Sequence, residues 1–340
     1  MSRTELEAVA RAMVARGKGI LAADESSGTI KKRFDSIALE STEEARRTYR
    51  EMLFTAPKAA DYISGVILYD ETIRQKTRAG VPFPEYLAKL GMIPGIKVDS
   101  GAKPLAGFPN ETITEGLDGL RERLAEYYKL GARFAKWRAV IDIGADFPTQ
   151  FAIDANAHAL ARYAALCQEA SIVPIVEPEV LMDGAHSIER CEAVTDAALE
   201  SLFNALYSHR VHLEGTILKP NMVISGKKAS PRANAQAVAE ATVRCLKRHV
   251  PTAIPGIAFL SGGQSSEDAT AHLGLMNKLG PLPWELTFSY GRALQDAALK
   301  AWGGKSENFA AGQAAFIKRA RLNGMAHAGR YSPALEQDAA

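Results

Sequence analysis

Short apolar runs alternate with segments of helical periodicity along most of the chain. Eight runs are rich in β-branched and aliphatic residues, and each ends on polar or turn residues. They lie at 18–24, 64–70, 94–99, 134–140, 173–179, 214–220, 256–262 and 285–290. Their starts are about 30 to 45 residues apart, which leaves room for a helix and two loops between successive strands of a parallel sheet.

The segments between these runs carry helix signals. Ser41, with Glu44 three residues later, matches a capping box ahead of a helix at 45–55. Apolar periodicity predicts further helices near 117–131, 153–170, 187–208, 235–249, 266–279 and 292–302, and a last helix at about 307–326.

Eight strands that alternate with helices, without a linker-like change in composition, predict a single (β/α)8 barrel, or TIM barrel, with helical additions at both ends. We assign residues 1–328 to this one domain. Residues 329–340 lack apolar periodicity and are expected to form a mobile tail. A two-domain doubly wound protein stays the alternative for a chain of 340 residues. Two polar stretches, 104–115 and 225–234, are predicted to be long loops at the C-terminal ends of strands.

The composition excludes several classes of protein. Hydrophobic residues make up 47% of the chain and charged residues 24%, which is typical of a folded globular enzyme. The 41 basic and 39 acidic residues leave a net charge of +2, so bulk charge predicts neither a nucleic-acid nor a membrane partner. The N-terminus lacks the apolar segment of a signal peptide, and the expected location is the cytoplasm.

Charged side chains gather at the ends of the predicted strands. Residues two apart on a strand point to the same side, so charges spaced in this way meet at the mouth of a barrel. An unpaired ion buried there costs several kcal/mol, which favours a functional cluster over separate structural ion pairs. The cluster comprises Asp24, Lys97, Asp99, Lys136, Arg138, Glu177, Glu179 and Lys219.

Clustered lysines and carboxylates suit Schiff-base chemistry. A second cation roughly 6 Å from a lysine lowers the pKa of that lysine by about two, which raises the fraction of free amine about a hundredfold. The free amine attacks a carbonyl, and a nearby acid dehydrates the resulting carbinolamine. Lys219 is the favoured nucleophile because Ile217 and Leu218 precede it and no acidic residue adjoins it.

The loops after the last two strands are predicted to bind phosphate. Glycines let backbone N–H groups approach an anion, serine adds a hydroxyl donor, and an arginine at a helix start adds a cation. The residues concerned are Ser261, Gly262, Gly263, Ser289, Gly291 and Arg292. The seven histidines do not gather at strand ends, and the three cysteines form no C-x-x-C pair, so no metal site is predicted.

Together these motifs resemble the class I fructose-1,6-bisphosphate aldolases, the metal-independent Schiff-base type. The resemblance runs from about residue 5 to residue 331. The sequence motifs that carry the resemblance are GILAADES (19–26), GIKVD (95–99), FAKWR (134–138), IVEPE (175–179), LKPNM (218–222), FLSGGQ (259–264) and FSYGR (288–292).

The resemblance implies roles for the central residues. Lys219 would form the Schiff base with the C2 ketone of fructose 1,6-bisphosphate, and Glu177 would serve as the acid–base group for its formation. Asp24 would take the C4 hydroxyl proton, and Lys136 would be a neighbouring cation. Glu179 would orient Lys136 and Glu177. The products would be dihydroxyacetone phosphate and glyceraldehyde 3-phosphate, as in glycolysis and gluconeogenesis.

The resemblance also implies how the phosphates are held and how the protein assembles. The C1 phosphate would contact Ser261, Gly262, Gly291 and Arg292, and the C6 phosphate side would comprise Ser26, Thr29, Arg33, Lys97 and Arg138. No cofactor is expected, and a homotetramer is expected from resemblance alone.

The chain departs from the family pattern in two places. Its loop after the first strand reads Ser26-Ser27-Gly28-Thr29, where many members have Ser-Thr-Gly-Ser, so hydroxyl groups are kept. Many members end in a tyrosine that helps to protonate the enamine, but this sequence ends Asp338-Ala339-Ala340 and its last tyrosine is Tyr331. The protonating group therefore stays open. The alternatives are a Schiff-base enzyme for a sugar with one phosphate and a catalytically silent scaffold.

Overall fold

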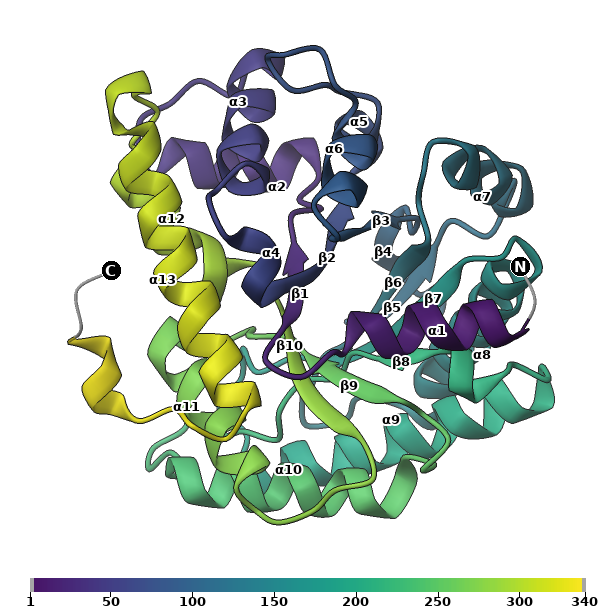
Figure 1. Ribbon diagram of the computed structural model, residues 1–340. Helices are drawn as coiled ribbons and strands as arrows, with labels where there is room; N and C mark the ends of the chain where they lie inside the picture. The colour runs from purple at the N-terminus through teal and green to yellow at the C-terminus, as the bar shows by residue number, and fades with distance from the viewer. Residues whose placement is uncertain (1–2, 338–340) are drawn as a thin grey trace.

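The computed structural model describes residues 3–337 and contains a closed barrel of eight parallel strands (Figure 1). Around the barrel the strands follow the order β1-β10-β9-β8-β7-β6-β3-β2. They are β1 (Gly19–Ala22), β2 (Ile63–Leu68), β3 (Ile93–Lys97), β6 (Phe134–Ile141), β7 (Val173–Val180), β8 (Ile217–Leu218), β9 (Gly256–Phe259) and β10 (Glu285–Tyr290). The barrel confirms the predicted fold and excludes the doubly wound alternative.

Helices cover the outside of the barrel and follow the strands in the predicted alternation (Figure 1). Among the described residues they are α1 (Arg3–Met13), α2 (Ser27–Asp35), α3 (Glu43–Phe54), α4 (Ala59–Tyr62), α5 (Asp70–Ile73), α6 (Phe83–Lys89), α7 (Leu120–Lys129), α8 (Gln150–Glu169), α9 (Ile188–Ser208), α10 (Ala235–His249), α11 (Ser266–Asn277), α12 (Arg292–Trp302) and α13 (Phe309–His327). Short 3-10 helices lie at Leu213–Gly215, Ser306–Asn308 and Pro333–Glu336. None of the helices in residues 3–337 is long and apolar enough to cross a membrane.

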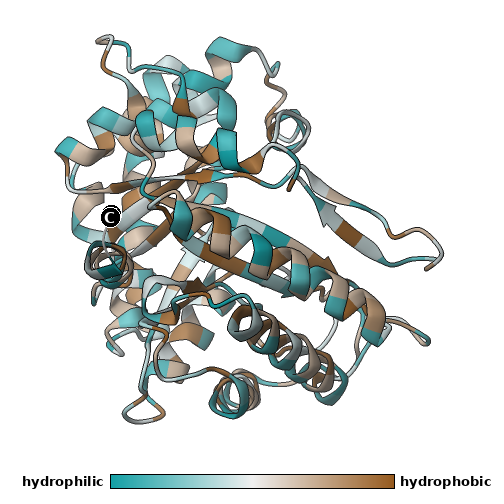
Figure 2. Ribbon diagram, turned by 90° about the vertical axis from the view of Figure 1, so that its right-hand side faces the viewer, coloured by the Kyte–Doolittle hydropathy of each residue, from teal (hydrophilic) through white to brown (hydrophobic). Residues whose placement is uncertain are grey.

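Two clusters make up most of the apolar core, and a third, smaller cluster includes Ile141, Val180 and Val194. One fills the space between the strands and the surrounding helices, and Figure 2 shows hydrophobic residues concentrated along the strands. The other joins the barrel interior to α1, where Leu6, Ala10 and Met13 pack with Ile20 and Ile175. Because α1 precedes β1 and packs on the interior, it closes the barrel at the N-terminal ends of the strands. The C-terminal ends stay open for a site.

The prediction of a loop throughout 104–115 is partly wrong: Pro104 and residues 112–115 belong to the strands of a β-hairpin, and residues 105–111 form the loop between them. Strands β4 (Gly101–Pro104) and β5 (Thr112–Glu115) pair antiparallel outside the barrel. Two threonines fasten the hairpin to β6: the Thr112 hydroxyl donates to the Val140 carbonyl at 2.8 Å, and the Thr114 hydroxyl donates to the Arg138 carbonyl at 2.7 Å. The other predicted loop, 225–234, contains no helix or strand.

The predicted capping box is also displaced. Helix α3 is capped by Thr42 instead of Ser41, and the Thr42 hydroxyl oxygen accepts the Ala45 N–H at 3.1 Å. Either residue type caps a helix well, and the spacing to Glu44 favoured Ser41, although the helix begins one residue later.

Part of the predicted mobile tail packs against the barrel. Tyr331 is buried, and its hydroxyl donates to Glu336, whose carboxylate pairs with Arg319 of α13 at 2.7 Å. Residues 338–340 lie outside the described residues. The mobility of 329–340 stays a prediction.

Candidate active site

A cavity of about 660 Å³ opens at the C-terminal ends of the barrel strands. Residues at or just beyond the ends of all eight strands line it, which is where barrel enzymes place their active sites. The structure therefore confirms that the charges predicted at strand ends meet in one place.

Nearly all of the predicted site residues line this cavity. They are Asp24, Ser26, Thr29, Arg33, Lys97, Lys136, Arg138, Glu177, Glu179, Lys219, Ser261, Gly262, Ser289, Gly291 and Arg292. Gly263 is the exception among the predicted set. It has a φ of +75°, and a Cβ at this position would lie 2.0 Å from Cγ of Met182, so a structural requirement explains its glycine.

The cavity also contains residues that the motifs did not single out. Lys32 reaches it from α2, and Tyr69 follows β2 directly. The strand-end argument could have found Tyr69, because it closes the second apolar run. No strand end precedes Lys32, so only the placement of α2 over the barrel mouth reveals it.

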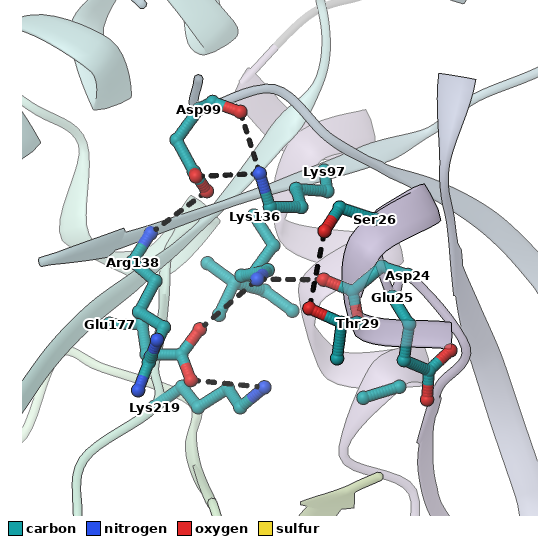
Figure 3. A network of polar contacts seen from close by, with 12 residues as sticks. Asp24, Glu25, Ser26, Thr29, Lys97, Asp99, Lys136, Arg138, Glu177 and Lys219 are labelled. Carbon is teal, nitrogen blue, oxygen red and sulfur yellow. Dashed lines mark hydrogen bonds and ion pairs between the residues drawn. The ribbon is translucent and has the colours of Figure 1, made fainter. Parts of the chain in front are cut away.

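Two lysines and two carboxylates form the centre of the cavity (Figure 3). Lys136 Nζ lies 2.7 Å from Asp24 Oδ2 and 3.6 Å from Glu177 Oε2. The other oxygen of Glu177, Oε1, lies 3.3 Å from Lys219 Nζ. Glu177 therefore stands between the two lysine nitrogens, with all of these side chains largely withdrawn from solvent.

The barrel register explains how these side chains converge. In the β6–β7 pair, Arg138 is opposite Glu177. Lys136 lies two residues before Arg138 and therefore points to the same side of β6. Lys219 directly follows the short strand β8, and its backbone N–H donates to the Val176 carbonyl at 2.9 Å. Adjacent strands thus aim Lys136, Glu177 and Lys219 into the mouth.

The charges of this centre stabilise one another. Burial opposes ionisation of Asp24, but the positive charges of Lys136 and Lys219 outweigh it and hold the pKa of Asp24 well below its usual range. Burial also opposes the charged form of Lys136, but Asp24 and Glu177 outweigh it and raise the pKa of Lys136. The centre therefore contains an aspartate that is held as an anion and a permanent ammonium beside it.

The pKa of Asp24 has a measurable consequence for stability. The pKa of Asp24 in the folded protein lies below its ordinary pKa of 3.8, so the ionised carboxylate stabilises the fold above pH 3.8. This contribution is lost as the pH falls towards the pKa of the folded protein. We expect wild type to unfold at higher urea concentration than Asp24→Asn at pH 7, and the gap to narrow by pH 3. An unchanged gap at the two pH values would contradict this origin of the stability.

Three other cations in the cavity are paired with carboxylates. Lys97 Nζ lies 2.7 Å from Asp99 Oδ1, and Arg33 Nη1 lies 2.7 Å from Glu25 Oε1. Arg138 pairs closely with Glu179. Glu179 thus contacts Arg138, whereas the sequence-based hypothesis had it orient Lys136 and Glu177. An anion that binds Lys97 or Arg138 has to compete with these carboxylates.

The loops after β9 and β10 present groups suited to an anion. Helix α12 begins at Arg292 directly after Gly291, and both residues line the cavity, so the N-terminus of this helix borders it. The Ser289 hydroxyl is buried without a hydrogen-bond partner among the described residues. Arg292 is exposed at the rim. These features match the phosphate site predicted after the last two strands.

The described residues contain no group of three or more histidine, cysteine, aspartate or glutamate side chains arranged to hold a metal ion. The cysteines Cys167, Cys191 and Cys245 are all buried, and burial raises the pKa of each thiol. None of them lines the cavity.

Known proteins resemble this chain over nearly its whole length. A family model described as fructose-bisphosphate aldolase class-I matches residues 5–340. A probable fructose-bisphosphate aldolase class 1 of Xylella fastidiosa (strain 9a5c) is 63% identical over 332 residues, covering 97% of this chain and 99% of that protein. Fructose-bisphosphate aldolase 5, cytosolic, of Arabidopsis thaliana is 56% identical, covering 99% and 94%.

A solved structure shares the fold. It is the fructose-bisphosphate aldolase of Plasmodium falciparum in complex with TRAP and a small-molecule inhibitor, with a TM-score of 0.95 and 51% sequence identity. The match covers 97% of this chain and 95% of that one.

Proposed function

The chain belongs to the class I fructose-bisphosphate aldolase family, and we propose how its cavity cleaves fructose 1,6-bisphosphate. The family confirms the resemblance predicted from the motifs: the protein is an aldolase, a carbon–carbon lyase of glycolysis. Membership sets aside the scaffold alternative. The observation that supports the mechanism best is the position of Glu177, which contacts Lys136 and Lys219 at once.

The first half of the proposed reaction forms the Schiff base. The Nζ atom of Lys219, as the free amine, attacks the C2 ketone of the open-chain sugar and forms a carbinolamine. Glu177 lies within 3.3 Å of this nitrogen, so it can accept the proton released by the amine and return it to the departing hydroxyl as water leaves. The ammonium of Lys136 stabilises negative charge that develops on the substrate oxygens.

The second half breaks the carbon–carbon bond. Asp24 accepts the proton of the C4 hydroxyl, the C3–C4 bond breaks, and its electron pair moves to C3 and on to the iminium nitrogen as an enamine. Glyceraldehyde 3-phosphate departs. Protonation of the enamine at C3 and hydrolysis of the renewed iminium release dihydroxyacetone phosphate and free Lys219.

Tyr331 lies outside the cavity, and Tyr69 is the tyrosine that lines it among the described residues.

Two sets of groups bind the phosphates in this proposal. Ser261, Gly262, Ser289, Gly291 and Arg292 hold the C1 phosphate through hydroxyl groups, backbone N–H groups and a guanidinium. Ser26, Thr29, Arg33, Lys97 and Arg138 serve the C6 phosphate. Glu179 then sets the position of Arg138, which it contacts.

The remaining proposals rest on family membership. The reaction uses no metal ion or cofactor, because the Schiff base supplies the electron sink. The protein acts in the cytoplasm, as the name of the Arabidopsis relative states for that protein. It assembles as a homotetramer.

A coupled assay for triose phosphate tests the proposed function. The purified protein is expected to release triose phosphate from fructose 1,6-bisphosphate at the same rate with and without EDTA, because lysine chemistry replaces a Lewis acid. Fructose 1-phosphate is expected to be cleaved more slowly, since it lacks one of the two phosphates. Loss of activity in EDTA would contradict the mechanism, and faster cleavage of fructose 1-phosphate would favour the one-phosphate alternative.

A further inference from the structure

A buried ionic cluster lies next to the catalytic centre, centred on Glu25, the residue after Asp24. The Glu25 carboxylate is 5% exposed and contacts two arginines. Its Oε1 atom lies 2.7 Å from Arg33 Nη1 of α2, and its Oε2 atom lies 2.8 Å from Arg50 Nη1 of α3. In Figure 3 the Glu25 carboxylate points away from Lys136 and Glu177, so it takes no part in the central proton transfers.

Gln295 of α12 connects this cluster to the opposite end of the chain. The side chain is fully buried. Its Nε2 atom donates to the Ala22 carbonyl at 2.6 Å and to Glu25 Oε1 at 2.8 Å. Its Oε1 atom accepts the Tyr49 hydroxyl at 2.9 Å. Every polar atom of Gln295 is thus engaged, in contacts that span the β1 loop, α3 and α12.

The contacts of Gln295 begin where the sheet ends. Strands β1 and β10 are neighbours in the barrel, and their paired residues end at Leu21 and Tyr290. Beyond that point no strand pairing holds the two following loops together. Gln295 takes the place of strand pairing here, because its side chain donates to the carbonyl of Ala22, one residue beyond Leu21.

The two elements that this network joins both face the cavity. A Cβ placed on Gly291 would lie 3.4 Å from Arg33 Nη2 and 3.5 Å from the Ala22 carbonyl oxygen. The Arg33 guanidinium therefore lies against the first turn of α12. Burial opposes the charge of Arg33, but Glu25 outweighs it and raises the pKa of Arg33, so the guanidinium stays positive.

We propose that Gln295 and Glu25 are positioning residues that fix the spacing between the two phosphate-binding elements, and so determine the preference for a sugar bisphosphate over a monophosphate. The inference rests on the proposed function. The first element carries Ser26, Thr29 and Arg33, and the second carries Gly291 and Arg292. A bisphosphate contacts both elements, so its binding depends on the spacing between them, whereas fructose 1-phosphate contacts only one element.

Gln295→Met tests the proposal, because methionine keeps the volume of the side chain and removes its hydrogen bonds. We expect the ratio of kcat/KM for fructose 1,6-bisphosphate to that for fructose 1-phosphate to fall about tenfold, since small misplacements at a site are amplified in rate. The loss should appear mainly in KM for the bisphosphate. Asn323→Leu is the control: Asn323 is equally buried, bonds Thr270 and lies outside the cavity.

A merely structural role would lower kcat/KM for the two substrates equally, as in Asn323→Leu, and that result or an unchanged ratio would overturn the proposal. If Gln295→Met does not fold, Tyr49→Phe tests the proposal instead, because it removes only the hydroxyl group that donates to Gln295 Oε1. We then expect the ratio to fall about threefold. Tyr163→Phe is the control, since its buried hydroxyl donates to the Ile175 carbonyl away from the cavity. An inactive wild-type protein would instead refute the proposed function.

Discussion

Lys219→Met is expected to lower kcat for fructose 1,6-bisphosphate by about 10⁵-fold or more, because it removes the nucleophile on which every later step depends. Methionine is close to lysine in shape, so the apolar part of the side chain keeps its packing. The loss should appear in kcat, measured by coupled triose phosphate release, and the phosphate-binding groups should still hold the substrate.

Two further variants make this result specific. Lys305→Met changes an exposed lysine that does not line the cavity and should leave kcat unchanged. Lys97→Met changes a cavity lysine assigned to phosphate, so KM should rise while the Schiff base still forms. If Lys219→Met retained more than about a hundredth of wild-type kcat, Lys219 would not be the nucleophile.

Asp24→Asn is expected to lower kcat by about 10³-fold, within the range usual for loss of a general base. The amide has nearly the same shape but cannot accept the C4 hydroxyl proton. It also removes the anion that lies 2.7 Å from Lys136, so the charge balance of the centre changes. Because Schiff-base formation precedes this step, Asp24→Asn should still give a borohydride-trapped adduct.

The separation of these two steps is the informative part of the experiment. Single-turnover measurements should show adduct formation in Asp24→Asn without release of glyceraldehyde 3-phosphate. Asp183→Asn, which alters an exposed aspartate paired with Lys227, is the matched control and should behave as wild type. An Asp24→Asn protein that neither forms the adduct nor cleaves the sugar would place Asp24 before bond cleavage and contradict its role as the C4 base.

The sequence predicted the barrel and its central charges because both follow from local alternation. Lys136 and Glu177 lie within β6 and β7, where the period of two fixes the side of the sheet, and strand order then brings them together. Their partners were less predictable. Arg138 and Glu179 each belong to a predicted pair on their own strand, yet the ion pair forms between the two strands.

Long-range contacts explain what the sequence could not predict. Glu25 and Gln295 are 270 residues apart, and neither carries a motif that identifies the other. The hairpin at β4–β5 was missed because its alternation is short and Gly107 and Pro109 interrupt the segment. Lys32 faces the cavity only because α2 lies over the barrel mouth. Such features depend on how distant segments pack, which periodicity does not reveal.

The most direct test of the central claim is to locate the covalent bond. Wild-type protein is reduced with borohydride in the presence of fructose 1,6-bisphosphate or dihydroxyacetone phosphate, digested, and mapped by peptide mass spectrometry. The account predicts one modified lysine, Lys219, carrying a reduced triose phosphate in amounts near one per chain. Modification of Lys136 or Lys97 instead, or no adduct from an active enzyme, would contradict it.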